Sequence, residues 1–89
     1  MNAIITVVGT DQVGIIARVS GFLAERKINI ADISQTILSG NFVMVMMVEF
    51  SPESESLEAV KQQLTALSDS LNVSISIMHE KVFSAMHRI

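Results

Sequence analysis

The chain of 89 residues has no cysteine, no tryptophan, no tyrosine and a single proline. Without cysteine it can form neither disulfides nor thiolate metal sites, and it has no thiol for nucleophilic catalysis. RNA-binding sheets stack bases on exposed aromatic side chains with basic neighbours. Four phenylalanines in a chain of net charge −3 do not meet that need. Thiol chemistry and base stacking on a sheet are therefore excluded.

Basic residues and long hydrophobic runs are also scarce. Of the six lysines and arginines only Arg26 and Lys27 are adjacent, so no basic stripe is present to neutralise phosphates. The longest apolar run, Phe42–Val48, is far shorter than the roughly 20 residues of a membrane-spanning helix. The N-terminus shows no pattern of a secretory signal peptide. We therefore expect a cytoplasmic protein that binds neither nucleic acid nor membranes directly.

Apolar residues, in contrast, are abundant for so short a chain. They make up 49% of the sequence, including six methionines, and the mean hydropathy is +0.49. A chain of this length buries only about 60–65% of the surface that its unfolded form exposes. Packing against a second copy is the simplest use of the excess apolar surface. We expect a homodimer or a higher homo-oligomer.

Hydrophobic periodicity predicts four strands and two helices. Strands are expected over 2–9, 29–38, 42–50 and from 72, and helices over 13–27 and 57–71. Asp11 is the expected cap of the first helix, and Ser54 or Ser56 that of the second. Ser39-Gly40-Asn41 is a hairpin signal between the second and third strands. The order βαββαβ predicts an α+β, ferredoxin-like fold, with a four-stranded antiparallel sheet and both helices on one face.

The whole chain, residues 1–89, is expected to be one domain with a core over about 2–78 and a C-terminal tail over 79–89. The tail is amphipathic, and we expect Phe83 and Met86 to face inward in a short final helix. No internal repeat, linker or low-complexity tract is recognisable.

The third strand is apolar on both sides. One side carries Phe42, Met44, Met46, Val48 and Phe50, and the other carries Val43, Val45 and Met47. Two helices cover only one face of a sheet, and a face in contact with water would alternate with polar residues. The uncovered face or an edge strand is therefore expected to contact another subunit. Glutamate at position 46 or 45 is expected to weaken that contact.

The sequence gives little support for a catalytic site or a metal site. His79 and His87 lie eight residues apart without converging ligands. Glu53, Glu55 and Glu58 lie where acidic residues favour the start of a helix. Met44, Met46 and Met78 offer thioethers to a soft copper ion, but methionines at strand spacing are more often hydrophobic filler. We expect no enzyme activity, no cofactor and no metal.

An acylphosphatase on the same layout is also excluded, because its first loop needs a phosphate-binding arginine. Loop 9–14 has none, and Arg18 lies within the expected helix.

The more informative feature of loop 9–14 is Asp11-Gln12-Val13-Gly14, which leads into the first helix. A helix N-terminus suits a ligand carboxylate, and glycine allows close approach to the backbone. The alternative is that Gly14 only permits a tight turn.

The segment ITVVGTDQVGIIARVSGFLAERKINIADISQ resembles an ACT domain, a small regulatory module that binds amino acids and related metabolites. The similarity covers about residues 2–78. The resemblance is greatest to stand-alone single-ACT proteins of bacteria and archaea. It extends to one half of the glycine-cleavage-type regulators, which carry two ACT units. In that family, ligands lie between two ACT units, with the loop after strand one from one unit and strand two from its neighbour.

The resemblance implies the following ligand-binding residues: Asp11, Gln12, Val13, Gly14 and Ile15 from one copy, and Asn29, Ile30, Ala31 and Asp32 from the other. Val13 replaces the proline, and Asp11 the asparagine, that many amino-acid-binding members have. An acidic Asp11 favours a ligand's ammonium group over its carboxylate. Without the resemblance, Asn29 is an ordinary residue at a helix end and Asp32 a solvent-facing strand residue.

Two functions remain open. The first is a homo-oligomeric regulatory module that binds an amino acid or related metabolite and acts through a partner protein. The second is a protein-association module without a ligand. A response to metabolites would distinguish them.

Overall fold

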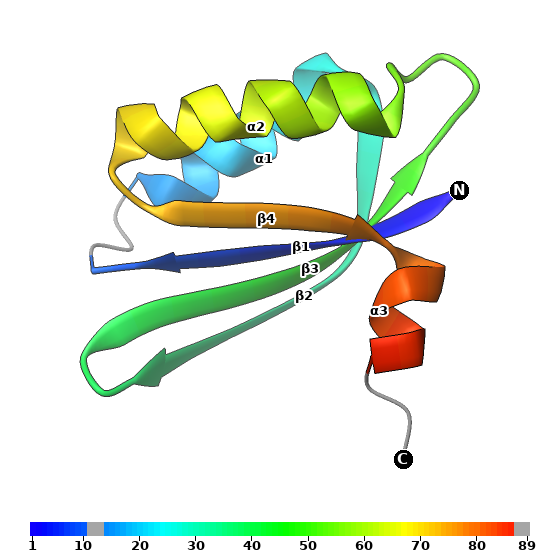
Figure 1. The fold of residues 1–89 in the computed structure, drawn as a ribbon. Coiled ribbons are helices and arrows are strands. Elements are labelled where there is room, and N and C mark those ends of the chain that lie inside the picture. Colours follow the sequence, from blue (N-terminus) through cyan, green and yellow to red (C-terminus); the bar gives the residue numbers. More distant parts are fainter. Residues whose placement is uncertain (11–13, 87–89) are drawn as a thin grey trace.

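The computed structural model describes residues 1–10 and 14–86. The strands are β1 (Asn2–Gly9), β2 (Ile28–Leu38), β3 (Asn41–Phe50) and β4 (Ser74–His79), and the helices are α1 (Ile15–Glu25), α2 (Leu57–Leu71) and α3 (Glu80–Met86). The sheet order is β2-β3-β1-β4, and every neighbouring pair is antiparallel. Helices α1 and α2 cover one face, and α3 lies on the other side (Figure 1). The predicted ferredoxin-like fold is confirmed.

The core lies between the sheet and the pair α1 and α2. Its largest fully buried side chains come from β1, α1, β3 and α2: Ile5, Val7, Val19, Leu23, Phe42, Met44, Met46, Val48, Val60 and Leu64. The buried side of α1 is formed by Ile15, Val19, Phe22 and Leu23. Within residues 1–10 and 14–86 no helix is long and apolar enough to cross a bilayer.

The two sides of β3 have different roles. Met46 lies on the helix-covered side and is fully buried, whereas Val45 pairs with Thr6 on the open face and is half-buried. The expectation that glutamate at either position tests an interface is therefore wrong for Met46, which is a core residue. Met78 pairs with Ile4 on the open face, away from Met44 and Met46. The three thioethers do not converge, so no copper site forms from them.

The ends of α2 follow local chemistry. Ser56 is the N-cap, and its Oγ accepts a hydrogen bond from the Ala59 N–H at 3.2 Å, which confirms one of the two expected caps. The helix ends at Leu71, and the φ of its C-cap residue, Asn72, is left-handed at 55°. The N–H of Val73 still donates to the Ser68 carbonyl at 3.1 Å. The last strand therefore begins at Ser74, two residues later than predicted.

Helix α1 begins later and ends earlier than predicted. Gly14 occupies its N-cap position with φ 86°, and the first helical residue is Ile15. At the other end Lys27, with φ 59°, turns the chain into β2. The expected cap, Asp11, lies outside the described residues.

Strand β2 contains a bulge that the sequence pattern does not reveal. The register shifts between Ile30, which pairs with Val48, and Asp32, which pairs with Met47. Ala31 is the extra residue. A bulge moves the following side chains to the opposite face from the one that strict alternation gives. Ile33 and Ile37 consequently lie on the helix side, opposite Met46 and Phe42.

The hairpin between β2 and β3 matches the predicted turn. Ser39 and Gly40 have φ values of 53° and 79°. Positive φ at both central residues is the requirement of a type I′ turn.

The C-terminal tail forms α3, which contacts β1 and β4. Phe83 is half-buried, as expected of an inward side chain. Met86 is 65% exposed, so its predicted inward orientation is wrong. The reason is the shortness of α3, whose seven residues give only two turns and include no buried residue.

Gly9 allows close packing at the end of β1. A Cβ on Gly9 would lie 2.6 Å from Val73 Cγ1 and 3.3 Å from Val73 Cβ. We expect Gly9→Ala to lower the free energy of unfolding by about 1–3 kcal/mol, because Val73, directly before β4, must move to make room for the added Cβ. Urea denaturation followed by circular dichroism measures the loss. Gly21→Ala is the control, since nothing lies within 4 Å of its added Cβ, and equal stability of the two variants would contradict the packing argument.

Candidate functional site

The predicted ligand site has two halves: residues 11–15, here called the loop half, and residues 29–32, here called the strand half. The loop half lies at the start of α1. Gly14 is exposed, and its carbonyl accepts the first helical hydrogen bond, from the Arg18 N–H at 2.9 Å. A Cβ added to Gly14 would meet nothing within 4 Å. Ile15 is buried in the core and anchors the helix start. The other predicted residues of this half, 11–13, lie outside the described residues.

The strand half lies at the start of β2. The Asn29 Nδ2 donates to Glu49 Oε1 at 2.8 Å across the β2–β3 pair. Asp32 Oδ1 accepts from the Ile33 N–H at 2.9 Å, and Ala31 is the bulged residue. Asn29 is a strand residue, not the left-handed helix-end residue of the alternative interpretation, since Lys27 has that role. Ile30 is half-buried beside Val48, and Asp32 is exposed.

These two halves lie at opposite ends of the sheet. Gly9, at the end of β1, pairs with Phe42, whereas Asn29, at the start of β2, pairs with Glu49. Phe42 and Glu49 are seven residues apart along β3, which corresponds to about 23 Å. Figure 1 shows the end of β1 and the start of β2 at opposite ends of the sheet. One chain therefore does not bring the predicted site residues together.

Strand β2 is an edge of the sheet and is largely uncovered. Among the described strands it pairs only with β3, and all residues from Ala31 to Leu38 are exposed. Ile33 and Ile37 are 39% and 58% exposed although they lie on the helix side. A long edge strand with apolar side chains and unpaired backbone groups favours addition of another strand.

A surface pocket of about 520 Å³ lies beside the loop half of the site. It is lined by Thr10, Gly14, Ile15, Arg18, Ser70, Leu71, Asn72 and Val73. Sequence reasoning singled out Gly14 and Ile15 but missed residues 70–73. These residues join the α1 start only through tertiary packing of the α2–β4 connection, which no local pattern reports.

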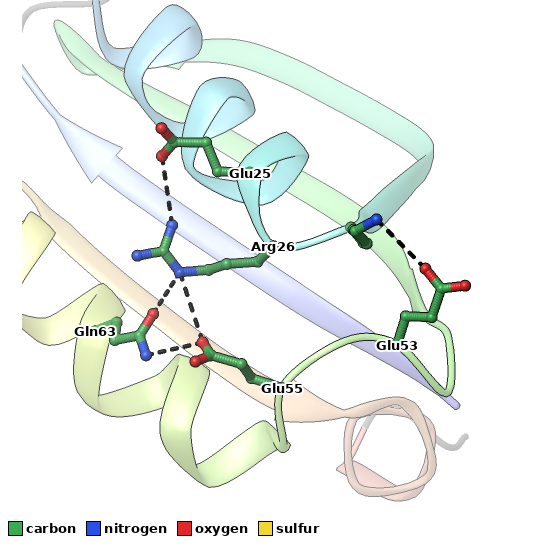
Figure 2. Close-up of a pocket in the computed structure, with 6 residues that line it drawn as sticks. Glu25, Arg26, Glu53, Glu55 and Gln63 are labelled. Atoms are coloured by element: carbon green, nitrogen blue, oxygen red, sulfur yellow. Dashed lines mark hydrogen bonds and ion pairs between the residues drawn. The ribbon is translucent and has the colours of Figure 1, made fainter.

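A second pocket, of about 410 Å³, lies between the end of α1 and the start of α2 (Figure 2). Arg26 is its centre: the guanidinium lies 3.6 Å from Glu25 and 3.8 Å from Glu55, and its Nε donates to Gln63 Oε1. Gln63 Nε2 in turn donates to Glu55 at 2.9 Å. Arg26 also stacks on the Phe22 ring at 3.7 Å. This network joins α1 to α2 and leaves little unpaired charge for a ligand.

The carboxylates considered for catalysis do not gather into an acid–base pair. Glu53 binds Lys27 at 3.5 Å, Glu55 belongs to the Arg26 network, and Glu58 is in the first turn of α2. No group of three histidines, cysteines or acidic residues converges among residues 1–10 and 14–86. His79 Nδ1 accepts from the Lys81 N–H at 3.0 Å. His87 lies outside the described part of the chain.

The fold and the sequence agree with one family. The sequence pattern of the ACT domain matches residues 2–78. The chain belongs to the ACT domain family. A UPF0237 protein of Listeria innocua is 47% identical over 89 residues, which is 100% of both chains. A UPF0237 protein of Methanosarcina mazei is 46% identical over 86 residues, covering 97% of this chain and 94% of that protein.

Solved structures extend the comparison. An ACT domain protein from Streptococcus pneumoniae has a TM-score of 0.83 and 40% identity, covering 100% of this chain and 97% of that one. A structure named as a glycine cleavage system transcriptional repressor has a TM-score of 0.79 at 20% identity, covering 86% of this ACT chain and 45% of that one. The latter likeness shows the fold alone. The resemblance to stand-alone ACT proteins is confirmed, and it indicates a regulatory module more than a catalytic domain.

Proposed function

We propose that this ACT protein is a cytoplasmic, homodimeric module that binds an amino acid or a related metabolite and regulates a partner protein. The ligand site lies between two copies. One copy contributes Asp11–Ile15 and the other contributes Asn29–Asp32. Residues 2–78 form the regulatory core of a single domain over 1–89, and the tail 79–89 lies outside it.

The separation of the two halves within one chain is the observation that supports this proposal. Because Gly9 and Asn29 lie about 23 Å apart along the sheet, a ligand of amino-acid size cannot contact both halves of one copy. If both halves bind the same ligand, they must come from different copies.

Pairing of two β2 edges meets this requirement. Strands β1 and β2 are parallel to each other, because each is antiparallel to β3. An antiparallel β2–β2 pair about a twofold axis places the start of one β2 beside the end of the other. The partner's β1–α1 connection lies at that same end of its sheet. A continuous eight-stranded sheet therefore brings Asn29–Asp32 of one copy and Asp11–Ile15 of the other to the same end.

Such an interface also uses the exposed surface of β2. Pairing satisfies the outward backbone groups of the edge, and it covers Ile33 and Ile37 on the helix side. A ligand that contacts both copies binds only the dimer, so it shifts the equilibrium toward that state. A coupling of about 1–3 kcal/mol is typical of such regulation and suffices to alter a partner's activity.

The alternative function, association without a ligand, has one observation in its favour. The side chains of Asn29 and Asp32 already make hydrogen bonds within their own chain, to Glu49 and to the Ile33 N–H. A ligand would have to share or replace these bonds.

A thermal-shift screen of the twenty amino acids and common metabolites, run beside size-exclusion chromatography, tests the proposal. A ligand at 100-fold excess over Kd adds about 2.7 kcal/mol to native stability. In a domain of this size that raises Tm by several degrees. A selective shift in an oligomer supports the sensor. No shift with an intact oligomer contradicts it and favours the association module.

The backbone of Gly14 offers a specific test of the loop half. Its added Cβ would have free space, so Gly14→Val acts through its φ of 86°, which costs a β-branched residue about 1–2 kcal/mol. We expect loss of the metabolite-induced Tm shift, because the loop must adopt another backbone conformation. The measurement is the same thermal-shift assay.

Gly21→Ala is the matched control for this variant. Gly21 lies in the same helix with free space and no positive φ, so alanine there is expected to raise stability by about 0.5–1 kcal/mol and to leave the shift unchanged. An unaltered ligand response in Gly14→Val would show that the loop is not part of the site.

A further inference from the structure

The regular part of the exposed β2 edge has a definite midpoint. The bulge at Ala31 interrupts the strand on one side, and the turn that begins at Ser39 ends it on the other. The segment between them, residues 32–38, keeps an unbroken register with β3. Two copies of this segment pair over their full length only when Gln35, the middle residue, lies on the twofold axis.

The alternation of side chains restricts the possible registers further. In a continuous sheet with a twofold axis perpendicular to it, opposite residues of the two strands lie on the same side of the sheet. Neighbours along a strand point to opposite sides. Because the two copies are identical, one residue must therefore lie opposite itself. Within the regular segment the possible centres that pair at least three residues are positions 33 to 37.

The side chains on the helix side of β2 favour the same centre. Ile33, Gln35 and Ile37 lie on this side, and all three are exposed. With Gln35 opposite itself, Ile33 of each copy lies opposite Ile37 of the second copy. In each of the other four registers, one of these isoleucines lies beyond the regular segment of the second copy. Only the centre at Gln35 covers both apolar side chains with apolar partners.

The polar residues of the segment match in this register as well. The two Gln35 side chains lie beside each other between isoleucines, and their amides can exchange two hydrogen bonds. A polar pair among apolar neighbours specifies register, because a shifted strand would leave the amides without partners. On the open face, Ser34 of one copy lies opposite Thr36 of the second copy, and their hydroxyls can also form a hydrogen bond.

We propose that two copies pair through β2 in the register that sets Gln35 opposite Gln35 of the second copy. This inference rests on the proposed dimer and adds which residues meet and which remain free. The pairing covers residues 32–38 and leaves residues 29–31 of the strand half outside the paired segment, open to a ligand. A register centred on Ile33 would instead set Asn29 opposite Ile37 of the second copy.

Single cysteines test the register, because the chain has no cysteine of its own. Opposite residues of an antiparallel pair have Cα atoms about 4.5–5.5 Å apart, which is within the range of a disulfide. Gln35→Cys oxidised with diamide is expected to form a covalent dimer about tenfold faster or more than Gln62→Cys. The Gln62→Cys thiol lies on the exposed side of α2 and measures random collisions.

Four further single variants report the neighbouring registers, and all of them change exposed residues: Ile33→Cys, Ser34→Cys, Thr36→Cys and Ile37→Cys. Each is expected to cross-link no faster than Gln62→Cys, because in the proposed register its Cα lies about 8 Å or more from its counterpart. The double variant Ile33→Cys with Ile37→Cys is expected to cross-link rapidly, and peptide mass spectrometry should find position 33 joined to position 37.

The outcomes separate the register from the dimer. Fastest cross-linking at a position other than 35 would overturn the register and leave the proposed function intact. Slow cross-linking at all five positions in a chain of dimeric mass would place the interface away from β2 and overturn the register. A monomeric mass of the unmodified chain in sedimentation would overturn both the register and the proposed function.

Discussion

Glutamate at Met46 is expected to unfold the chain. Met46 is fully buried between β3 and the helices, opposite Ile5 of β1. An unpaired carboxylate there loses its hydration and gains no partner, at a cost of about 4–5 kcal/mol or more. Domains of this kind have total stabilities of only about 5–15 kcal/mol. Far-ultraviolet circular dichroism and urea denaturation of Met46→Glu are expected to show a largely unfolded or strongly destabilised protein.

Val45→Glu is the matched control for this prediction. The same substitution one residue away falls on the open face, where Val45 is half-buried beside Thr6 and Ser34. We expect a folded protein that has lost about 1 kcal/mol. Similar stabilities of the two variants would mean that the assignment of the two faces of β3 is wrong.

Lysines at Ile33 and Ile37 are expected to convert the proposed dimer into a folded monomer. Both side chains are exposed in the single chain, so charge there costs the fold little. In paired β2 edges, four like charges would lie close together, and such contacts cost several kcal/mol. The dissociation constant is expected to rise about 100-fold or more, since each 1.4 kcal/mol is a factor of ten. Light scattering after size-exclusion chromatography measures the mass.

The control adds the same two charges elsewhere. Gln62 and Ala66 are exposed on α2, away from the β2 edge, and Gln62→Lys with Ala66→Lys is expected to remain dimeric. If the β2 double variant also stayed dimeric, the interface would lie elsewhere, and the open face of the sheet would be the next surface to test.

Most of the fold follows from periodicity. The apolar spacing of α1 and α2, the alternation of β1 and β4 and the apolar run of β3 predict the elements, because each side chain's burial follows its position in one helix or strand. The errors have local physical causes. The β4 start depends on Asn72 adopting a left-handed conformation after α2, and the orientation of Ile33 depends on the bulge at Ala31. Asparagine is one of the residues that adopt this conformation at a helix end, but the strand pattern from Val73 on gives the earlier start, and the bulge has no distinctive sequence signal.

The site is less predictable than the fold. Gly14 and Ile15 attract attention because a glycine begins a helix, but Asn29 and Asp32 stand out only through the family resemblance. The pocket beside Gly14 and Ile15 could not be predicted, because its other lining residues, among them Arg18, Ser70 and Asn72, come together only when the chain folds. A charged residue in a helix usually indicates a solvated face. The structure shows that Arg18 is exposed and also lines this pocket.

The most direct test of a shared site is the mass of the unmodified chain in solution. Sedimentation velocity over a range of micromolar concentrations measures it without a label or a ligand. We predict a species of twice the 9.7 kDa of one chain. A monomer throughout that range would contradict a site built from two copies, because the β1–α1 connection and the start of β2 would then never meet.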